Sequence, residues 1–465
     1  MSLRAAGFRA FLTFASLAGN ALAAAGPEWK PIVDVRLRAE LFDTPAASTT
    51  ADRGYNFLIG RARLGGELAW GKQFAIRGLL QGAATTALPD RAGFGGGLTY
   101  FNTNGGDRTP SQVGLAELAF LWKSDRHTLC VGRQGWADGA GPATGIAHLD
   151  FVRARRLAER LVGNLDFANV GRRFDGATLS VKAGDGGTFE LFALRPLGGA
   201  FNYEQAFDSL DVDVFGLSWA TKHDSWIPAS SLRLFAQGYQ DGREVASRAF
   251  GDEVRMETLG GSLLAGGDSW DLLLWAALQQ GDLGSRDHSA WAAIVDLGYR
   301  FTEVPGKPSI HFGWEQASGG GASGESKNFY NLLPTNHKFY GALDYFAFSN
   351  LRDLFLEARW SASEKLSLSA ALHDFRLVDR AGPWVGGSGA FSDREVGYQF
   401  RRPATGVFSA SSLGQELDLS AVWALPRGFA TKLEGGLFWG GEAAEQVLPA
   451  ESDGSWISLE LTYKL

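Results

Sequence analysis

Apolar and charged side chains alternate along residues 32–41, near the start of the chain. The apolar positions are Val33, Val35, Leu37, Ala39 and Leu41. The charged positions between them are Asp34, Arg36, Arg38 and Glu40. Successive side chains of a β-strand point to opposite faces, so the pattern predicts a strand with one apolar face and one charged face.

The same alternation continues to the last residue and predicts about 18 strands. They are expected at residues 32–42, 57–70, 73–82, 112–122, 127–134, 174–182, 188–194, 212–221, 231–239, 256–265, 270–279, 289–301, 310–314, 355–362, 366–375, 415–425, 429–439 and 455–465. Short polar turns, such as 71–72, alternate with long polar connections, such as 83–111. Short periplasmic turns and long extracellular loops are typical of bacterial outer-membrane barrels.

Two fold classes share this alternation. A soluble β-sandwich would turn its apolar faces to a core and its charged faces to water. An outer-membrane barrel would turn its apolar face to lipid and its charged face to a wet lumen. Because the pattern runs through the whole chain, we favour an all-β fold. We expect a transmembrane antiparallel β-barrel that forms a single domain over residues 26–465. This barrel would lie in the bacterial outer membrane, with its outer face in contact with the lipid.

The first 25 residues have the features of an export signal. Arg4 and Arg9 give a positive start, residues 11–17 are apolar, and residues 21–23 or 23–25 offer a small-residue cleavage site. We expect residues 1–25 to be a cleaved signal peptide. No later apolar run reaches the roughly 18 residues that a spanning helix requires, whereas barrel strands need only about 9–11.

The composition narrows the possible partners. The 61 glycines suit turns, and the 15 tryptophans and 32 phenylalanines suit the aromatic girdles of a barrel. The single cysteine, Cys130, excludes an intramolecular disulfide. A formal net charge of −7 argues against nucleic acid as a partner.

Arginines on the polar faces of the strands are the main functional signal. The alternation places seven candidate pore-lining residues towards the lumen: Arg36, Arg38, Arg61, Arg63, Arg77, Arg173 and Arg359. Guanidinium groups in a confined pore would concentrate anions and disfavour cations. The alternative is that arginines and the nearly equal number of carboxylates brace one another across neighbouring strands. The first four strands are the richest in arginine, so we expect the constriction there.

Arg133 and Asp175 complete the set of candidates. Leu129 and Val131 share the parity of Arg133 and should face lipid. Arg133 therefore points inward only if a β-bulge intervenes near Gly132.

No catalytic or metal-binding arrangement is predicted. Asp287-His288-Ser289 invites comparison with serine hydrolases of the outer membrane. His288 and Ser289 are adjacent on a strand and face opposite sides, so they cannot hydrogen-bond as base and nucleophile. No paired His or Cys spacing suggests a metal, and no cofactor is expected.

Three stretches resemble the alginate export porins. The first is Glu159-Arg160-Leu161-Val162-Gly163 with Arg172-Arg173-Phe174-Asp175-Gly176. The second is Leu333-Pro334-Thr335-Asn336-His337-Lys338-Phe339-Tyr340-Gly341, with Asp344 and Asn350-Leu351-Arg352-Asp353. The third is Leu413-Gly414-Gln415-Glu416-Leu417-Asp418, and Gly132-Arg133-Gln134 looks like the family's inward-pointing arginine. The resemblance implies an 18-stranded barrel with an arginine-lined pore for a uronate polymer, with Arg133, Arg173 and Asp175 near its constriction.

One departure from that family concerns the periplasmic mouth. The alginate exporter closes this mouth with a long turn between strands 16 and 17. Here that connection is only Leu425-Pro426-Arg427-Gly428, which is too short to form a plug. Residues 83–111 remain as the candidate to fold over the pore from the extracellular side.

The sequence thus predicts a non-enzymatic, passive channel for anionic saccharides, with alginate-like polyuronate export implied by the resemblance. One alternative is an uptake porin for acidic oligosaccharides or small organic acids. Another is a structural or scaffold barrel that does not conduct. Expected partners are an anionic polysaccharide or oligosaccharide and a periplasmic export or scaffold protein.

Overall fold

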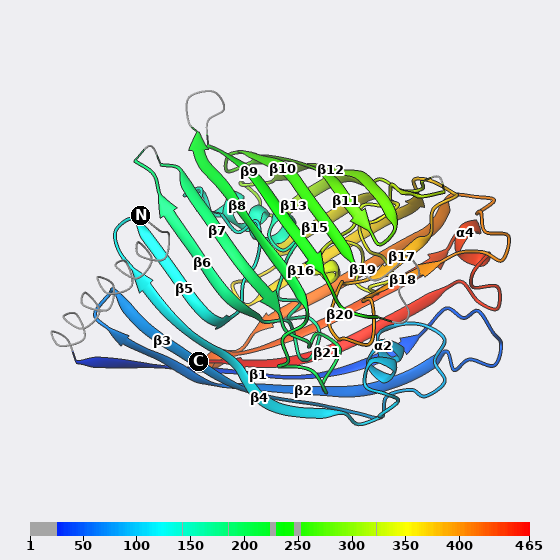
Figure 1. Ribbon diagram of the computed structural model, residues 1–465, viewed down its shortest axis with the longest axis horizontal. Helices are drawn as coiled ribbons and strands as arrows, with labels where there is room; N and C mark the ends of the chain where they lie inside the picture. The colour runs from blue at the N-terminus through cyan, green and yellow to red at the C-terminus, as the bar shows by residue number, and fades with distance from the viewer. Residues whose placement is uncertain (1–25, 142, 185, 224–228, 246–252, 322) are drawn as a thin grey trace.

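The computed structural model describes residues 26–465 apart from 142, 185, 224–228, 246–252 and 322. The predicted signal peptide and most of the turn predicted at 224–229 lie outside the described residues. The described chain forms a closed β-barrel with strongly tilted strands (Figure 1).

Eighteen antiparallel strands build the barrel, and each pairs with its neighbour in sequence until β21 pairs with β1. The first nine are β1 (Pro27–Asp43), β2 (Gly54–Trp70), β3 (Phe74–Thr86), β4 (Ser111–Lys123), β5 (His127–Gln134), β6 (Phe174–Lys182), β7 (Thr188–Pro196), β8 (Val212–His223) and β9 (Ser230–Asp241). The others are β10 (Val254–Gly266), β11 (Trp270–Leu283), β12 (Arg286–Arg300), β13 (Ser309–Ala317), β15 (Leu351–Ser361), β16 (Leu366–Leu377), β19 (Ser412–Ala424), β20 (Phe429–Gly440) and β21 (Gly454–Lys464). The predicted fold class and strand number are confirmed.

Smaller elements lie in the connections. The two-residue strand β14 (Glu325–Ser326) adds to β12 in parallel, and β17 (Trp384–Gly387) pairs with β18 (Tyr398–Arg401) in a separate hairpin. The helices are α2 (Gly96–Thr103), α3 (Ala147–Val152) and α4 (Glu442–Glu445), with single turns η1 (Arg153–Leu157), η2 (Asn336–Lys338) and η3 (Pro426–Gly428). Within the described chain, no helix has the length and apolar character needed to cross a bilayer.

The alternation of β1 appears in the structure as two different faces. Leu37 and Leu41 are each 53% exposed on the outside of the wall, whereas Arg36, Arg38 and Glu40 are 2–6% exposed on the inside. The last strand repeats this pattern, with Ile457 and Leu459 exposed outside. The predicted apolar outer face and charged inner face are therefore confirmed.

The two ends of the barrel differ. β1 begins and β21 ends where the strands are joined by short turns, while α2, α4, β17 and β18 lie at the opposite end (Figure 1). Because long connections mark the extracellular side of bacterial barrels, the chain termini lie at the periplasmic end. The turn between β19 and β20 is short, as predicted, and closes with a hydrogen bond from Leu425 N to Phe429 O of 2.8 Å.

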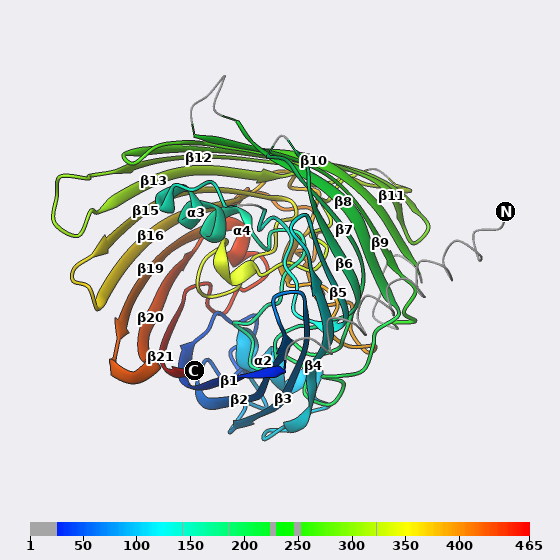
Figure 2. The ribbon, with the colours of Figure 1, turned by 90° about the vertical axis from the view of Figure 1, so that its left-hand side faces the viewer.

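Three long connections fill the lumen instead of projecting from it: residues 135–173, 318–350 and 378–411. Figure 2 shows α3, from the first of them, inside the ring of strands. Their apolar side chains form a core within the barrel that includes Leu161, Leu333 and Trp384. The barrel wall thus surrounds a packed interior in which only limited cavities remain.

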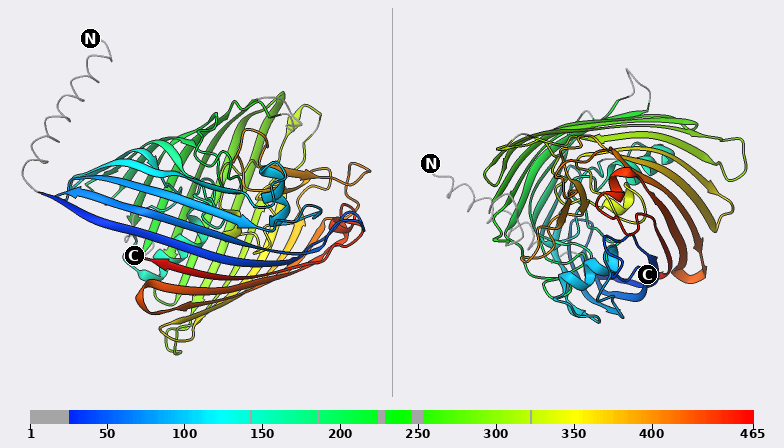
Figure 3. Two further views of the ribbon diagram at one scale, coloured as in Figure 1. Left: turned by 90° about the horizontal axis from the view of Figure 1, so that it is seen from below. Right: turned by 90° about the vertical axis from the view of Figure 1, so that its right-hand side faces the viewer.

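Residues 83–111 cover part of the extracellular end of this interior. Figure 3 shows α2, in light blue, at that end. The hydroxyl of Tyr100 on α2 accepts a hydrogen bond of 2.8 Å from Asn169 N, and Asn202 Nδ2 donates one of 2.7 Å to Thr103 O. This segment is therefore tied to two of the connections between strands.

The two faces of β16 allow a direct test of the fold. Leu372 is 47% exposed on the outer face, and its neighbour Ala371 lines a lumen cavity at the same depth. We expect Leu372→Arg to lower the free energy of unfolding in lipid vesicles by about 2–4 kcal/mol, because the charge enters the hydrocarbon region. Ala371→Arg should cost much less, since Glu357 and Asp418 are its cross-strand neighbours. Equal losses in urea titrations of the two variants would contradict the assignment of faces.

Candidate functional site

Two cavities lie one behind the other inside the barrel. The outer cavity, of about 380 Å³, lies at the extracellular end, and the inner cavity, of about 300 Å³, lies on the side of the short turns. Arg38, Phe167 and Ala342 line both cavities. The two cavities therefore meet at these three residues, which we call the junction.

Arg38 on β1 is held in place at the junction by three kinds of contact. Its guanidinium lies 4.0 Å from the centre of the Phe167 ring, and Nη1 donates a hydrogen bond of 3.0 Å to Phe167 O. Nε donates another of 3.0 Å to Glu40 Oε1, and Glu460 lies 3.5 Å from Nη1. Arg38 is thus a fixed positive charge at the point where the two cavities meet.

His337 in η2 lines the inner cavity beside the junction. Its ring stacks on Phe167 with centroids 3.3 Å apart, and its Nδ1 lies 2.9 Å from Asp344 Oδ2. Its Nε2 lies 3.7 Å from Glu434 on β20. Burial alone would lower the pKa of His337, but Asp344 and Glu434 raise it to about 9. The imidazole is therefore a cation at neutral pH.

The other arginines of β1 and β2 hold the connection 135–173 against the wall. Arg36 donates hydrogen bonds of 2.6 Å to Asp166 O and 2.9 Å to Ala168 O. Arg63 donates one of 2.8 Å to Asp166 Oδ1 and one of 3.3 Å to Val170 O. We call these contacts to residues 166–170 the arginine clamp. It explains why Arg36 and Arg63 are only 6% and 4% exposed.

Asp166 is the shared carboxylate of the arginine clamp. Its Oδ1 lies 2.8 Å from Arg63, 3.4 Å from Arg173 and 3.5 Å from Arg61. Desolvation opposes its ionisation, but the three guanidinium groups hold the pKa of Asp166 well below its usual range. Arg173 also contacts Glu117 on β4 at 3.1 Å. In these contacts arginines and carboxylates pair with one another, which is the alternative to a ring of free arginines considered from the sequence.

A second cluster of charge lines the inner cavity around Glu357 on β15. Arg156 forms an ion pair with Glu357, Arg359 lies 3.0 Å from it, and Arg155 lies 3.5 Å from it. Asp296 lies 3.4 Å from Arg156. Arg155 is the most accessible of the three, with 34% of its side chain exposed.

Several of these residues were not among the sequence-based candidates because they lie on connections, where strand parity gives no information. Arg155, Arg156 and Arg160 are examples, and Arg160 pairs with Glu315 at 2.6 Å in the interior. Arg172 donates hydrogen bonds to Gly163 O, Leu333 O and Ser388 O, and so joins all three infolded connections. The dense arginine spacing at positions 153, 155, 156 and 160 is the one sequence signal that could have identified this cluster.

The structure places seven of the nine candidates on the inside of the wall: Arg36, Arg38, Arg61, Arg63, Arg77, Arg173 and Arg359. Of these, Arg36 and Arg38 line the inner cavity. Arg77 instead pairs with Glu67 at 2.9 Å towards the periplasmic end.

Arg133 and Asp175 face outward, which corrects the expectation for these two residues. Arg133 is the register partner of Leu118, which is 51% exposed on the outer face. The pairing of β4 with β5 has no bulge at Gly132, so Arg133 keeps the parity of Val131. The two side chains form a paired contact near the rim, with Arg133 Nε and Nη2 at 2.8 and 3.0 Å from the carboxylate of Asp175.

His288 and Ser289 are not arranged as the base and nucleophile of a hydrolase. His288 is buried in the lumen with Nε2 3.4 Å from Gln279 Oε1, while Ser289 is exposed on the other face of β12. The predicted opposite orientation of these two side chains is confirmed. Among the side chains that the structure describes, no group of three or more His, Cys, Asp or Glu residues is arranged to hold a metal ion.

Comparison with known proteins identifies a family and a fold. The sequence model of the family described as alginate export matches residues 33–458. The outer membrane protein OpdK of Pseudomonas aeruginosa has a TM-score of 0.57 at 10% identity, covering 94% of this chain and 98% of that chain. OccK9 (OpdG) of the same organism has a TM-score of 0.59 at 14% identity, covering 94% and 98%. OccAB3 of Acinetobacter baumannii has a TM-score of 0.57 at 9% identity, covering 94% and 100%. No curated protein sequence matches the chain.

Removing the shared carboxylate should loosen the arginine clamp. In Asp166→Asn, three guanidinium groups lose a charged partner. Because the Asp166 side chain is 47% exposed and solvent screens part of these interactions, we expect the barrel to lose about 1–2 kcal/mol of stability. The connection 135–173 should also become more sensitive to protease added to reconstituted barrels. Asp211→Asn is the control, because Asp211 is 66% exposed and lies 3.6 Å from Arg195 at the surface. A cleavage pattern shared by the two variants would contradict the clamp.

The charge of His337 should make the pore sensitive to alkaline pH. The pKa in the folded state, about 9, is above that of an unfolded histidine, so the stabilising contribution is complete below about pH 6.5 and is lost as the pH rises through about 9. Over the same rise the junction loses one positive charge. We expect anion preference and thermal stability to fall between pH 8 and 10 in the natural protein. In His337→Gln both curves should lack this step, and an identical step in the two proteins would assign it to other groups.

Proposed function

Because this chain belongs to the alginate export family, we propose that it is a passive outer-membrane channel for anionic saccharides. Its barrel is that of a bacterial outer-membrane porin.

The observation that carries the proposal is the charge of the inner cavity. Six cationic side chains line it: Arg36, Arg38, Arg155, Arg156, Lys338 and Lys432. Five carboxylates line it: Asp166, Glu357, Asp418, Glu434 and Glu460. Protonated His337 adds a seventh positive charge, so this cavity is cationic in a protein whose formal net charge is −7. A confined positive region raises the local concentration of anions and disfavours cations.

The pairing of these cations suits conduction. Each uronate carboxylate would compete with a protein carboxylate for a guanidinium group, so binding at any one position would be weak. Conduction requires binding that is favourable enough for a solute to enter and weak enough for it to leave. A passive pore encodes no direction, so export of a polyuronate and uptake of acidic oligosaccharides or small organic acids use the same path.

One observation favours a second candidate, a scaffold barrel that does not conduct. The arginine clamp and the core formed by the three infolded connections fill much of the lumen. In that case the paired arginines would serve only to hold the interior together.

Planar-bilayer recording separates the two candidates. The reversal potential of the purified protein is measured in a KCl gradient, with and without uronate oligomers. Anion selectivity that the oligomers block supports the saccharide channel, and anion selectivity without block supports smaller acids. The absence of conductance supports the scaffold.

Arg155 provides the sharpest test of the cationic cavity. It is partly exposed in the inner cavity and makes only a 3.5 Å contact with Glu357, so Arg155→Glu should fold normally. We expect the anion-to-cation permeability ratio to fall at least about twofold, because the local charge changes by two units. Arg91→Glu is the control, since Arg91 is 73% exposed away from both cavities. The proposal fails if the two variants shift the reversal potential equally.

A further inference from the structure

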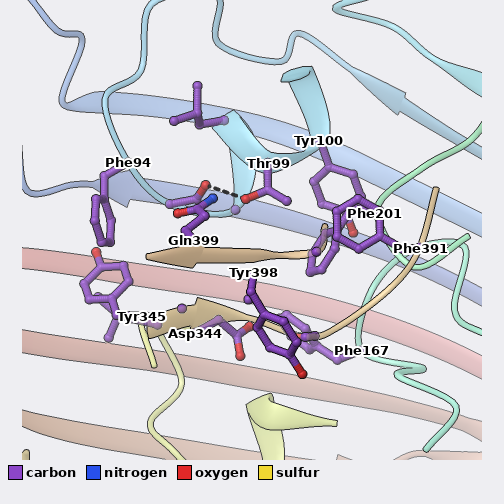
Figure 4. Close-up of a pocket in the computed structure, with 18 of the residues that line it drawn as sticks. Phe94, Thr99, Tyr100, Phe167, Phe201, Asp344, Tyr345, Phe391, Tyr398 and Gln399 are labelled. Carbon is purple, nitrogen blue, oxygen red and sulfur yellow. Dashed lines mark hydrogen bonds between the residues drawn. The ribbon is translucent and has the colours of Figure 1, made fainter. Parts of the chain in front are cut away.

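The outer cavity differs from the inner cavity in having nine aromatic side chains among its lining residues. Figure 4 shows these rings around a shared space, with Thr99 and Gln399 between them. Phe94 and Tyr100 come from the segment that contains α2, and Phe391 and Tyr398 come from the connection that contains β17 and β18. Phe167 closes the cavity at the junction. The cavity therefore offers apolar ring faces on several sides and opens at the extracellular end of the barrel.

Arg401, at the end of β18, brings a partly buried positive charge to this aromatic cavity. Its guanidinium lies 4.3 Å from the centre of the Phe94 ring and 5.2 Å from that of Trp384. Nη2 donates a hydrogen bond to the side-chain oxygen of Gln399, and Nη1 has no hydrogen-bond partner. No carboxylate of the described chain forms an ion pair with it. Burial lowers the pKa of Arg401 to about 10, so the group still carries its charge at neutral pH.

The other charges that line the outer cavity are already compensated. Arg38 pairs with Glu40 at 2.8 Å, and Asp344 pairs with His337 at 2.9 Å. Arg394 pairs with Glu204 at 2.6 Å. Burial raises the pKa of Glu395, which favours the neutral form of this carboxyl group. Arg401 is thus the lining charge that a ligand would neutralise.

We propose that the outer cavity is a binding subsite for a six-membered ring that carries one carboxylate, with the ring between the aromatic walls and the carboxylate on Arg401. This inference rests on the proposed function, because it places the subsite on the path of an anionic solute. The same chemistry is presented by a free ring acid and by the terminal residue of a polyuronate.

The physical basis is the match between the two parts of the ligand and the two parts of the cavity. A guanidinium group binds a carboxylate through parallel hydrogen bonds, and it does so most strongly where water is excluded. Aromatic faces bury the apolar surface of a ring at little cost in side-chain entropy. The volume of about 380 Å³ lies at the lower end of the range for small-molecule pockets, which suits one or two rings.

The position of the subsite also defines the next contact. The outer cavity ends at the junction, where Arg38 faces the inner cavity. A carboxylate released by Arg401 therefore meets a second arginine before it reaches the cationic lumen.

Single-channel recording with defined acids tests the subsite. Benzoate and galacturonate are ring acids, a short oligogalacturonate tests the polymer end, and acetate is the matched acid without a ring. We expect both ring acids to interrupt the current at concentrations at which acetate does not. In Arg401→Gln the dissociation constant derived from these interruptions should rise about 10- to 100-fold, with acetate unchanged. Arg401→Lys keeps the positive charge but lacks the two parallel donors of the guanidinium group, so it should give an intermediate dissociation constant.

Arg394→Gln is the matched control, because Arg394 lines the same cavity and is already neutralised by Glu204. It should leave the interruptions within about twofold of those of the natural protein. Folding of every variant is checked by the change in gel mobility on heating. Equal effects of the Arg401 and Arg394 variants, or interruptions by acetate as strong as those by benzoate, overturn the proposal.

Failure of the two proposals can be told apart. Anion-selective current without interruption by ring acids overturns the subsite and leaves the channel in place. If the protein does not conduct, the channel proposal fails, and quenching of tyrosine and tryptophan fluorescence by galacturonate in detergent micelles still tests the subsite. In that measurement, quenching that is lost in Arg401→Gln supports the subsite, and quenching that is equal in both overturns it.

Discussion

The structure depends on the requirement that every backbone donor and acceptor inside a bilayer be paired within the protein. Here the requirement is met by the pairing of β21 with β1, which runs from Asp34 opposite Lys464 to Asp43 opposite Ser455 and leaves the sheet without an edge. Closure divides the side chains strictly into a lipid-facing and a lumen-facing set. Since the apolar side chains of each strand face the lipid, the charged side chains that alternate with them face the lumen.

A barrel of this width leaves an interior that the wall cannot fill by itself. Three connections occupy it, and the arginine clamp holds one of them against β1 and β2. The arginines therefore have two physical consequences at once. They anchor the interior through hydrogen bonds, and they set the electrostatic potential along what remains open.

Much of the fold could be predicted from the sequence because period-two alternation has a direct physical cause. β5 and β6 begin and end at the predicted residues, and Arg36 and Arg38 lie on the predicted face. Arg133 was wrongly assigned because a motif was given more weight than the parity it shares with Val131. Asp175 was wrongly counted on the polar face, although it shares the parity of Leu179 and Val181 in β6. Arg155, Arg172 and Arg401 could not be placed, since a connection has no fixed period and its position depends on long-range packing.

The arginines of β1 and β2, those of the arginine clamp and Arg38, donate hydrogen bonds to four main-chain carbonyl oxygens: those of Asp166, Phe167, Ala168 and Val170. Every residue type supplies the same carbonyl oxygen, so substitutions at Phe167, Ala168 or Val170 leave those acceptors in place. The backbone path of the connection 135–173 therefore does not depend on which side chains it carries at these positions. Evolution or design can change what the junction presents to a passing solute while the scaffold beneath it stays the same.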